Sequence, residues 1–208
     1  MKIDILTIFP EMFSPLMESI MKRAQVKGLV EIKVHNLRDW STDKHKSVDA
    51  SPYGGGPGMV MRVDVVDRAV EALAGENTRV VLMDTKGPVY TQKKAEELKE
   101  YKHMVIIAPH YEGIDHRVHE HIANEVISIG EYVLTGGEIP AMVVVDSIVR
   151  LLPGVLGNEA SLAEESYQEE GEIEYPQYTR PEEYKGWKVP EILLSGHHAK
   201  INDWRKKS

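Results

Sequence analysis

Short runs of hydrophobic residues alternate along the chain with segments whose hydrophobic positions have helical spacing. The runs that indicate strands cover residues 3–8, 30–34, 80–83, 104–108 and 125–129. Those at 80–83 and 104–108 contain no polar residue, which is typical of strands buried on both faces of a parallel sheet. Because helical segments lie between them, we expect an α/β domain over about residues 1–155, a parallel sheet with helices on both faces.

The helices are predicted from apolar positions three and four residues apart. One such segment contains Phe13, Leu16, Met17, Ile20 and Met21, and Gly28 is suited to end it. The others are residues 63–73, residues 91–101 with Thr91 as N-cap, and the apolar segment 141–152. Residues 38–60 are polar and glycine-rich, and we expect them to form a long loop.

The composition changes after residue 154, which predicts a boundary. Residues 157–177 are acidic and lack apolar periodicity, so we expect a flexible linker there. Residues 178–208 contain two tryptophans and the apolar run 192–194, enough for a small helical piece but hardly for an independent core. The predicted organisation is a domain over 1–156, a linker over 157–177 and a C-terminal piece over 178–208.

Composition excludes several classes of protein. The 208 residues include no cysteine, which excludes a disulfide scaffold, a cysteine nucleophile, a zinc ribbon and an iron–sulfur protein. No apolar run approaches the roughly 20 residues of a membrane-spanning helix. Asp4 also interrupts the first apolar run, where a signal peptide needs a continuous one. We therefore expect a cytoplasmic protein with no membrane partner.

The net charge of −8, taken alone, argues against a nucleic-acid partner, because phosphate binding depends on Lys and Arg. The charge is unevenly distributed, however. Residues 159–174 contain seven glutamates and no Lys or Arg, and the rest of the chain has a net charge of −1. A basic surface elsewhere on the protein is therefore compatible with the composition.

Three glycine-containing segments stand where strands are expected to end, and ligands of parallel sheets bind at the carboxyl ends of strands. They are residues 52–59, 109–117 and 128–140. The first does not fit a phosphate-binding or dinucleotide-binding spacing, so a structural turn and a ligand loop are both open. The second, rich in acids and histidines, is either a site or a solvated helix cap. The third alternates glycine with Ile, Tyr and Leu, which suits a purine ring.

Arg150 lies near the end of the apolar helix predicted at 141–152, and a pair of glutamates, Glu164 and Glu165, follows later in the chain. An arginine at a helix C-terminus is explained by the helix dipole, and glutamates in a linker are usually solvated. These residues alone therefore do not indicate a site.

Six motifs occur in order over nearly the whole chain. They are Pro-Tyr-Gly-Gly-Gly-Pro-Gly-Met at 52–59, Tyr-Glu-Gly-Ile-Asp at 111–115, Ser-Ile-Gly-x-Tyr-Val-Leu-x-Gly-Gly-Glu-x-Pro-Ala at 128–141, Pro-Gly-Val-Leu-Gly at 153–157, Tyr-Thr-Arg-Pro at 178–181 and Leu-Leu-Ser-Gly at 193–196. Together they closely resemble the bacterial tRNA (guanine-N1)-methyltransferases, a family of the knotted SPOUT class. The resemblance runs from Ile8 to about Arg205.

The resemblance implies an S-adenosylmethionine-dependent enzyme that methylates N1 of guanosine 37 in tRNA, the nucleotide 3′ of the anticodon. It also implies a deep trefoil knot that holds the methyl donor, and a homodimer with active sites at the interface. The donor-binding residues carried over from the family are Met83, Asp84, Pro109, Tyr111, Glu112, Gly113, Ile129, Gly130, Glu131, Tyr132, Val133, Leu134, Gly136, Gly137 and Pro140.

The resemblance also assigns the chemistry. Guanine N1 carries a proton, so a base must remove it while negative charge develops on O6. The family's base is an aspartate of the linker, whose position matches Glu165. Because Glu165 is one methylene longer, Glu164 is an alternative base. The family's arginine matches Arg150, placed to stabilise O6, and the acidic linker becomes a lid that orders when both substrates are bound.

In this family the C-terminal region helps to bind tRNA. The basic residues of this chain expected to contact phosphates are Arg180, Lys185, Lys200 and Arg205. The chain stops soon after Trp204, whereas relatives continue into a longer helical region. A naturally short form and a missing or fused C-terminal domain are both open.

Several features depart from the family pattern. Pro109 stands where the family usually has glycine, and it has no N–H to donate. The family also requires magnesium, but no cluster of side chains in this sequence reads as a metal site. With Glu165 and the short C-terminus, these departures leave two alternatives: a catalytically weakened RNA-binding relative, or a SPOUT methyltransferase that acts on another RNA.

Overall fold

The computed structural model describes residues 1–157, 166–167 and 173–206. Glu164 and Glu165, like most of the predicted linker 157–177, lie outside the described residues. The chain divides into two units, Met1–Glu159 and Ala160–Ser208, and each is described by itself.

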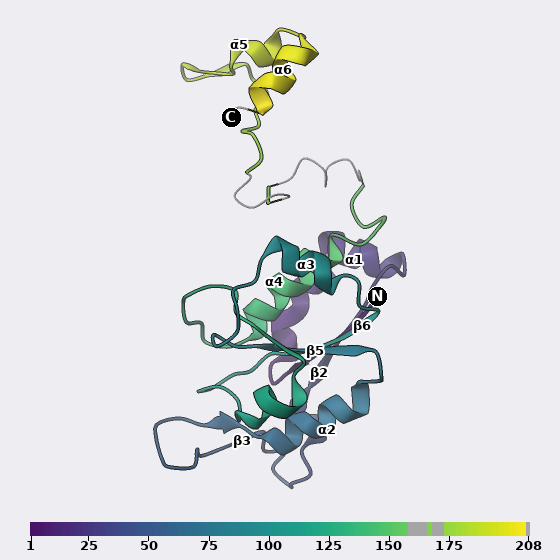
Figure 1. Ribbon diagram of the computed structural model, residues 1–208, viewed down its shortest axis with the longest axis vertical. Helices are drawn as coiled ribbons and strands as arrows, with labels where there is room; N and C mark the ends of the chain where they lie inside the picture. The colour runs from purple at the N-terminus through teal and green to yellow at the C-terminus, as the bar shows by residue number, and fades with distance from the viewer. Residues whose placement is uncertain (158–165, 168–172, 207–208) are drawn as a thin grey trace. The chain divides into compact units, whose positions relative to one another are not determined.

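A parallel sheet of five strands forms the centre of the first unit (Figure 1). The strands are β1 (Lys2–Thr7), β2 (Glu31–Asn36), β5 (Thr78–Met83), β6 (His103–Ile107) and β7 (Glu125–Ile127). Their order in the sheet is β2-β1-β6-β5-β7. All neighbouring pairs are parallel, so that Leu6 on β1 is aligned with Ile107 on β6. The predicted parallel α/β sheet is confirmed.

Burial explains the apolar runs 80–83 and 104–107 within the two central strands. Residues 104–107 of β6 are completely buried, and residues 80–83 of β5 are at most 4% exposed. Removing apolar side chains from water on both faces stabilises the sheet by about 25 cal/mol per Å². Asp4 and Thr7 on β1 are polar and are also completely buried.

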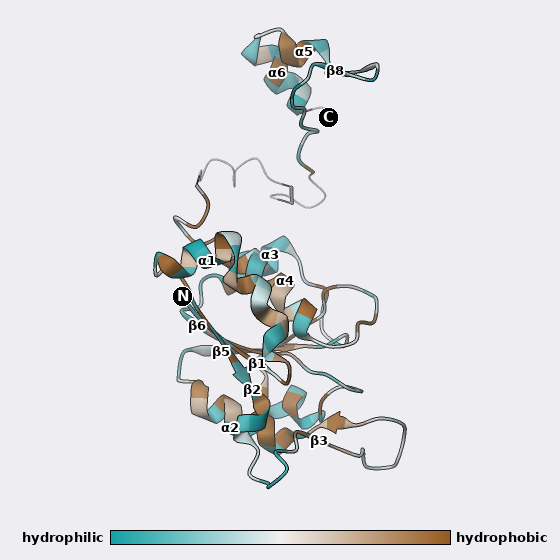
Figure 2. Cartoon of the chain, turned by 180° about the vertical axis from the view of Figure 1, so that it is seen from behind, coloured by the Kyte–Doolittle hydropathy of each residue, from teal (hydrophilic) through white to brown (hydrophobic). Residues whose placement is uncertain are grey.

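Helices cover both faces of the sheet. On one face, η1 (Pro10–Met17), α1 (Ser19–Val26), α3 (Gln92–Leu98) and α4 (Glu138–Val149) pack together. On the other, α2 (Val63–Leu73) packs against η2 (Leu37–Trp40) and η3 (Val118–Ile122), and Figure 1 shows the two layers on opposite sides of the strands. Figure 2 shows both polar and apolar residues on α1 and α2, as expected of helices with one side on the sheet.

The helix predicted around residues 13–21 is in fact two helices. The 3-10 helix η1 ends before Glu18, and α1 begins at Ser19, whose φ of 49° is incompatible with a continuous α-helix. Pro15 inside η1 also lacks the N–H that an α-helix would use. Gly28, with a φ of 69°, follows the end of α1 as predicted.

The other predicted helices are present with small shifts of their ends. α2 has the predicted bounds, and α3 is shorter than the predicted 91–101. Its N-cap is Thr91, whose side chain accepts a hydrogen bond from the Lys94 N–H at 3.3 Å. α4 begins at Glu138, three residues before the predicted start, and the π-helix η3 directly follows residues 109–117, where only the helix-cap alternative implied a helix.

The predicted loop 38–60 has local structure. It contains η2 and a short antiparallel pair, β3 (Asp49–Ala50) with β4 (Val60–Met61). Its turn is built on Asp43, which accepts hydrogen bonds from the backbone N–H groups of Ser47 (3.2 Å) and His45 (2.8 Å). These hydrogen bonds, that from Ser47 above all, lower the pKa of Asp43 to about 2.

The second unit consists of a hairpin and two short helices. They are β8 (Glu183–Tyr184), β9 (Trp187–Lys188), α5 (Glu191–Leu194) and α6 (His198–Arg205). The hairpin was not predicted, although its turn residues Lys185 and Gly186 have the positive φ values of a tight hairpin turn, 54° and 86°. None of the described residues from 173 to 206 is fully buried. Wherever the structure describes the chain, it contains no helix long and apolar enough to cross a membrane.

Candidate active site

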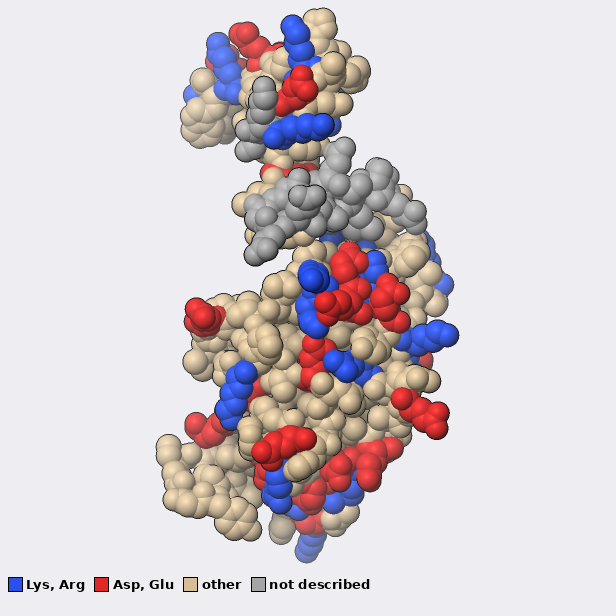
Figure 3. Space-filling model, viewed as in Figure 1, with Lys and Arg blue, Asp and Glu red and all other residues tan. Residues whose placement is uncertain are grey.

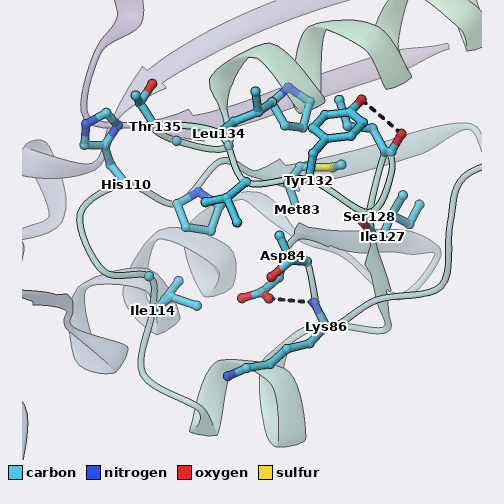
Figure 4. Close-up of a pocket in the computed structure, with 18 of the residues that line it drawn as sticks. Met83, Asp84, Lys86, His110, Ile114, Ile127, Ser128, Tyr132, Leu134 and Thr135 are labelled. Carbon is cyan, nitrogen blue, oxygen red and sulfur yellow. Dashed lines mark hydrogen bonds between the residues drawn. The ribbon is translucent and has the colours of Figure 1, made fainter.

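A pocket of about 250 Å³ opens at the carboxyl ends of β5, β6 and β7. Its walls are the loops that follow these strands and the first turn of α4 (Figure 4). The predicted donor-binding residues that line it are Met83, Asp84, Pro109, Tyr111, Glu112, Gly113, Ile129, Gly130, Tyr132, Val133, Leu134, Gly136, Gly137 and Pro140. Glu131 is the predicted donor residue that does not line it.

The lining also contains residues outside the predicted donor-binding set. They are Thr85, Lys86, His110, Ile114, Ile127, Ser128 and Thr135. Each lies within two positions of a predicted donor-binding residue. Closeness in sequence to a motif was therefore the signal that could have identified these lining residues. In an irregular loop no fixed period indicates which side chains face inward, and the tertiary structure decides it.

The loop after β7 is shaped by its own hydrogen bonds and by a glycine. The Ser128 hydroxyl donates to the Gly130 carbonyl at 3.0 Å, and the Tyr132 hydroxyl donates to the Ile129 carbonyl at 3.2 Å. A Cβ at Gly130 would collide with the Tyr132 ring. Gly130 thus allows Tyr132 to fold back over the loop, which places an aromatic ring beside backbone polar groups.

A close backbone contact joins the loops after β6 and β7. The Gly137 N–H donates to the Pro109 carbonyl at 2.6 Å. A Cβ at Gly137 would lie 2.8 Å from the Pro109 nitrogen and 3.0 Å from Ala108 Cα, closer than such atoms normally approach. Pro109 therefore takes part through its carbonyl, and the N–H that it lacks is not needed for this contact.

The glycine-rich segment 52–59 meets the loop after β6. The Glu112 N–H donates to the Met59 carbonyl at 3.1 Å, and a Cβ at Gly58 would collide with the Glu112 side chain. No residue of 52–59 lines the pocket. In this structure the segment supports the Glu112 loop from outside.

Asp84 places a carboxylate on the pocket wall. Its Oδ1 accepts a hydrogen bond from the Lys86 N–H at 2.9 Å (Figure 4), and its Oδ2 lies 3.1 Å from Nε2 of His119. The His119 side chain is only 7% exposed. Its Nδ1 is one of two buried side-chain nitrogens in the described residues that lack a hydrogen-bond partner. This arrangement fixes a negative charge where it favours a cationic ligand.

A second carboxylate is buried behind the pocket. Glu138, the first residue of α4, is 1% exposed. Its Oε1 accepts a hydrogen bond from the Thr7 hydroxyl at 3.1 Å, and its Oε2 lies 3.2 Å from Nδ1 of His110. A Cβ at Gly136 would collide with the Glu138 carboxylate and the His110 ring. The glycine therefore leaves room for this pair of side chains.

The remaining charges of the segment 109–117 form an ion pair outside the pocket. Arg117 donates to the Asp115 carboxylate from Nε (2.9 Å) and from Nη2 (2.7 Å). These hydrogen bonds hold the pKa of Asp115 below its usual range. Neither residue lines the pocket, so this pair fits the interpretation of the segment as a helix cap. His110, Tyr111 and Glu112 of the same segment do line the pocket, which fits the interpretation as a site.

The two predicted catalytic residues have different outcomes. Glu165 lies outside the described residues. Arg150 is the C-cap of α4 and does not line the pocket, whereas Pro140 in the first turn of α4 does. At 1.5 Å per residue, the helix places about 15 Å between Pro140 and Arg150. The pocket and Arg150 of one chain are therefore at opposite ends of α4.

The four predicted tRNA-binding residues belong to the second unit. Arg180, Lys185 and Lys200 are exposed. Arg205 is half-buried, and its guanidinium lies 4.6 Å from the centre of the Tyr175 ring, a cation–π contact.

Among the described residues there is no group of three or more His, Cys, Asp or Glu side chains placed to hold a metal ion, so they do not fit a resident magnesium.

Comparison with known proteins identifies the family of this chain. The family model described as tRNA (Guanine-1)-methyltransferase TrmD matches residues 1–208. Similar proteins named tRNA (guanine-N(1)-)-methyltransferase occur in Dictyoglomus turgidum, Brevibacillus brevis and Carboxydothermus hydrogenoformans. They are 57%, 56% and 53% identical, and the alignments cover 100% of this chain and 84%, 86% and 82% of the respective relative. With the whole chain matched by the family model, this protein belongs to the TrmD family of tRNA (guanine-1)-methyltransferases.

Proposed function

We propose that this protein transfers the methyl group of S-adenosylmethionine to N1 of guanosine 37 in tRNA. The observation that carries the proposal is the meeting of three loops, after β5, β6 and β7, around one pocket whose lining includes the residues selected for the donor. Membership of the TrmD family supports the reaction and its RNA substrate.

The chemistry of the pocket suits the donor. Ile129, Leu134 and the Tyr132 ring supply apolar walls for an adenine, and the backbone groups of the glycine-rich loop supply hydrogen bonds for its edge. The carboxylate of Asp84 favours a ligand with positive charge, as the sulfonium and ammonium of S-adenosylmethionine have. When bound, the sulfonium supplies an electrophilic methyl group, so the protein's remaining task is to activate guanine.

Guanine is activated by removal of the N1 proton. A carboxylate of the linker, Glu165 or its neighbour Glu164, accepts this proton while the N1 electron pair forms the bond to the methyl group and the bond from methyl carbon to sulfur breaks, with the thioether S-adenosylhomocysteine as the leaving group. Negative charge that develops on O6 is stabilised by the guanidinium of Arg150. The linker acts as a lid that orders over the bound substrates.

A homodimer with shared active sites would bring Arg150 to a pocket. Within one chain α4 separates Arg150 from the pocket by about 15 Å, so an arginine from a second chain is the simpler source. Helices η1 and α4, which contact each other, and the residue before η1 have the exposed apolar side chains that an interface between chains needs. They are Phe9 and Met12 (both 38% exposed), Met17 (40%), Ile139 (46%) and Val143 (42%).

A trefoil knot around the donor is supported by the contacts of β7. On one side β7 is hydrogen-bonded to β5. On its other side, the Ser128 N–H donates to the Pro88 carbonyl at 3.0 Å and the Tyr90 N–H donates to the Ser128 carbonyl at 2.7 Å. The chain near Ser128 thus lies between β5 and the loop that leaves β5, an arrangement expected where the later segment is threaded through an earlier loop.

The second unit is the proposed tRNA-binding piece. Residues 178–208 contain seven Lys and Arg against four Asp and Glu, a net charge of +3 in a chain whose total is −8. Figure 3 shows acidic and basic side chains interspersed over the visible face of the first unit. Exposed Trp187 (71%) and Tyr184 (53%) on the hairpin add aromatic surface beside Lys185. Phosphate contacts from Arg180, Lys185 and Lys200 would supply the electrostatic part of binding.

Methyl transfer from labelled S-adenosylmethionine tests the proposal. Two tRNA transcripts are compared, one with guanosine and one with adenosine at position 37. We expect label in the first transcript only. Label in neither transcript, with donor binding retained, would instead favour a catalytically weakened RNA-binding relative. Label at another position or in another RNA would favour a different substrate.

A further inference from the structure

Three aromatic rings meet at the rim of the pocket. The ring of His110 contacts those of Phe9 and Tyr111 edge-to-face, with centroids 4.8 and 5.5 Å apart. Phe9 is 38% exposed, Tyr111 39%, and the side chain of His110 23%. Figure 4 places His110 at the edge of the pocket beside Thr135. An exposed group of rings next to the donor pocket is suited to contact a base of the RNA.

The buried carboxylate of Glu138 decides which nitrogen of His110 carries the proton. Glu138 receives one hydrogen bond from the Thr7 hydroxyl, and its other oxygen faces Nδ1 of His110. It also stands at the N-terminus of α4, where the helix dipole stabilises a negative charge. An ionised carboxylate only accepts hydrogen bonds, so Nδ1 of His110 is the protonated nitrogen.

The other nitrogen of the ring is open. In neutral imidazole the nitrogen without a proton is an acceptor, here Nε2. Within the described residues Nε2 has no hydrogen-bond partner, and it is not among the buried nitrogens that lack one, so solvent reaches it. The pair thus presents a hydrogen-bond acceptor of fixed orientation beside the pocket.

An acceptor at this place distinguishes purines. On its Watson–Crick edge guanine carries hydrogen-bond donors at N1 and at the 2-amino group, whereas adenine has an acceptor at N1 and no amino group at C2. We propose that Nε2 of His110 accepts a hydrogen bond from the 2-amino group of the target guanine, and that Glu138 is the positioning residue that orients the ring by accepting a hydrogen bond from Nδ1. This inference rests on the proposed guanine methylation and assigns part of its base specificity to these two residues.

Removing the amino group from the RNA and Nε2 from the protein tests this contact. The first substrate carries guanosine at position 37, and the second carries inosine, which lacks only the 2-amino group. His110→Asn keeps an amide N–H near the position of Nδ1 for Glu138 but has no counterpart of Nε2. We expect His110→Asn to lower kcat/KM on the guanosine substrate about 5- to 10-fold, the effect of one hydrogen bond. On the inosine substrate we expect a change of less than about twofold.

Two further variants complete the design. His110→Gln places an amide oxygen near the position of Nε2 and is expected to recover part of the activity on guanosine. Glu138→Gln removes the charge that fixes the tautomer and is expected to reduce the preference for guanosine over inosine. The ¹⁵N spectrum of labelled His110 provides a readout that a purely structural role would not change. It is expected to show protonated Nδ1 in the wild type and a mixture of tautomers in Glu138→Gln.

Several results would overturn the inference. Equal losses on guanosine and inosine would show that His110 does not contact the amino group. Weaker S-adenosylmethionine binding by His110→Asn, measured without RNA, would assign the ring to the donor instead. A wild-type ¹⁵N spectrum that shows a proton on Nε2 of His110 would mean that this nitrogen cannot accept a hydrogen bond from guanine. Failure of the proposed function is distinguishable, because the wild-type protein would then methylate neither substrate.

Discussion

The carboxylate of Asp4 on β1 and the imidazole of His103 on β6 are 2.7 Å apart, from Oδ2 to Nε2, with the carboxylate completely buried. Asp4 also accepts from Lys2 (2.6 Å) and His35 (2.7 Å), so three partners surround one charge. Burial alone would raise the pKa of Asp4, but these hydrogen bonds outweigh it and hold the pKa below its usual range.

This arrangement predicts how stability depends on pH. A carboxyl with a lowered pKa stabilises the fold above its unfolded pKa of about 3.9 and loses that contribution as the pH falls through its folded pKa. We expect Asp4→Asn to lower the free energy of unfolding by about 3 kcal/mol at pH 7. The difference from wild type should shrink below about pH 4. Urea denaturation at pH 7 and pH 3.5 measures the free energy of unfolding and its dependence on pH.

Asp39→Asn, which removes an exposed partner of Lys46, is the control and should change the free energy of unfolding little. An equal effect of both variants would contradict the special role of Asp4.

The charge of Asp84 is expected to contribute to donor binding. Asp84→Asn keeps the size of the side chain but removes the negative charge beside a cationic donor. We expect about tenfold weaker S-adenosylmethionine binding by calorimetry, the effect of losing a charged hydrogen bond. Asp115→Asn is the matched control, because Asp115 pairs with Arg117 and does not line the pocket. Unchanged donor affinity in Asp84→Asn would remove Asp84 from the donor site.

Gly137 is expected to tolerate no side chain. Its backbone lies too close to Pro109 and Ala108 for a Cβ, so Gly137→Ala must push apart the loops after β6 and β7. Overpacking of this kind costs about 1–3 kcal/mol, and donor binding should be lost with the loop contact. Gly75→Ala is the control, because a Cβ there meets no atom within 4 Å and the backbone does not require glycine. Thermal unfolding and calorimetry compare the two, and a Gly137→Ala protein that behaves like Gly75→Ala would be inconsistent with the described contact.

Arg150 is expected to act on the rate and not on the donor. Arg150→Ala should lower kcat about 100-fold or more, as loss of a group that stabilises a developing oxyanion does. S-adenosylmethionine affinity should stay near the wild-type value, since Arg150 does not line the pocket of its own chain.

If active sites are shared between chains, two inactive variants should complement each other. In a mixed dimer, the Arg150→Ala chain supplies an intact pocket and the Gly137→Ala chain supplies an intact Arg150. One of the two shared sites would therefore be complete. We expect recovery of activity on mixing and subunit exchange, read by methyl transfer. No recovery from dimers shown to be mixed would place Arg150 and the pocket in the same chain's site.

Much of the fold could be predicted because burial leaves a local trace in the sequence. The strands at 80–83 and 104–108 are buried on both faces and therefore apolar throughout. The helix at residues 63–73 has one face on the sheet and was predicted with its observed ends. Glycine and proline motifs indicated which loops surround the pocket. The break at Ser19 escaped prediction, because apolar spacing continues through it while the backbone does not.

The relationships that give the site its chemistry depend on residues far apart in the chain. Glu138 meets Thr7 across 131 positions, and Asp4 meets His103 across 99. The spacing of hydrophobic residues indicates which segments are buried and which form loops, because burial of a strand or helix leaves a pattern within a few residues. The motifs and their order along the chain indicate the family. The tautomer of His110, the partners of Asp84 and the distance of Arg150 from the pocket follow only from the register of the strands and the path of the loops. Long-range packing sets both, and no local pattern records it.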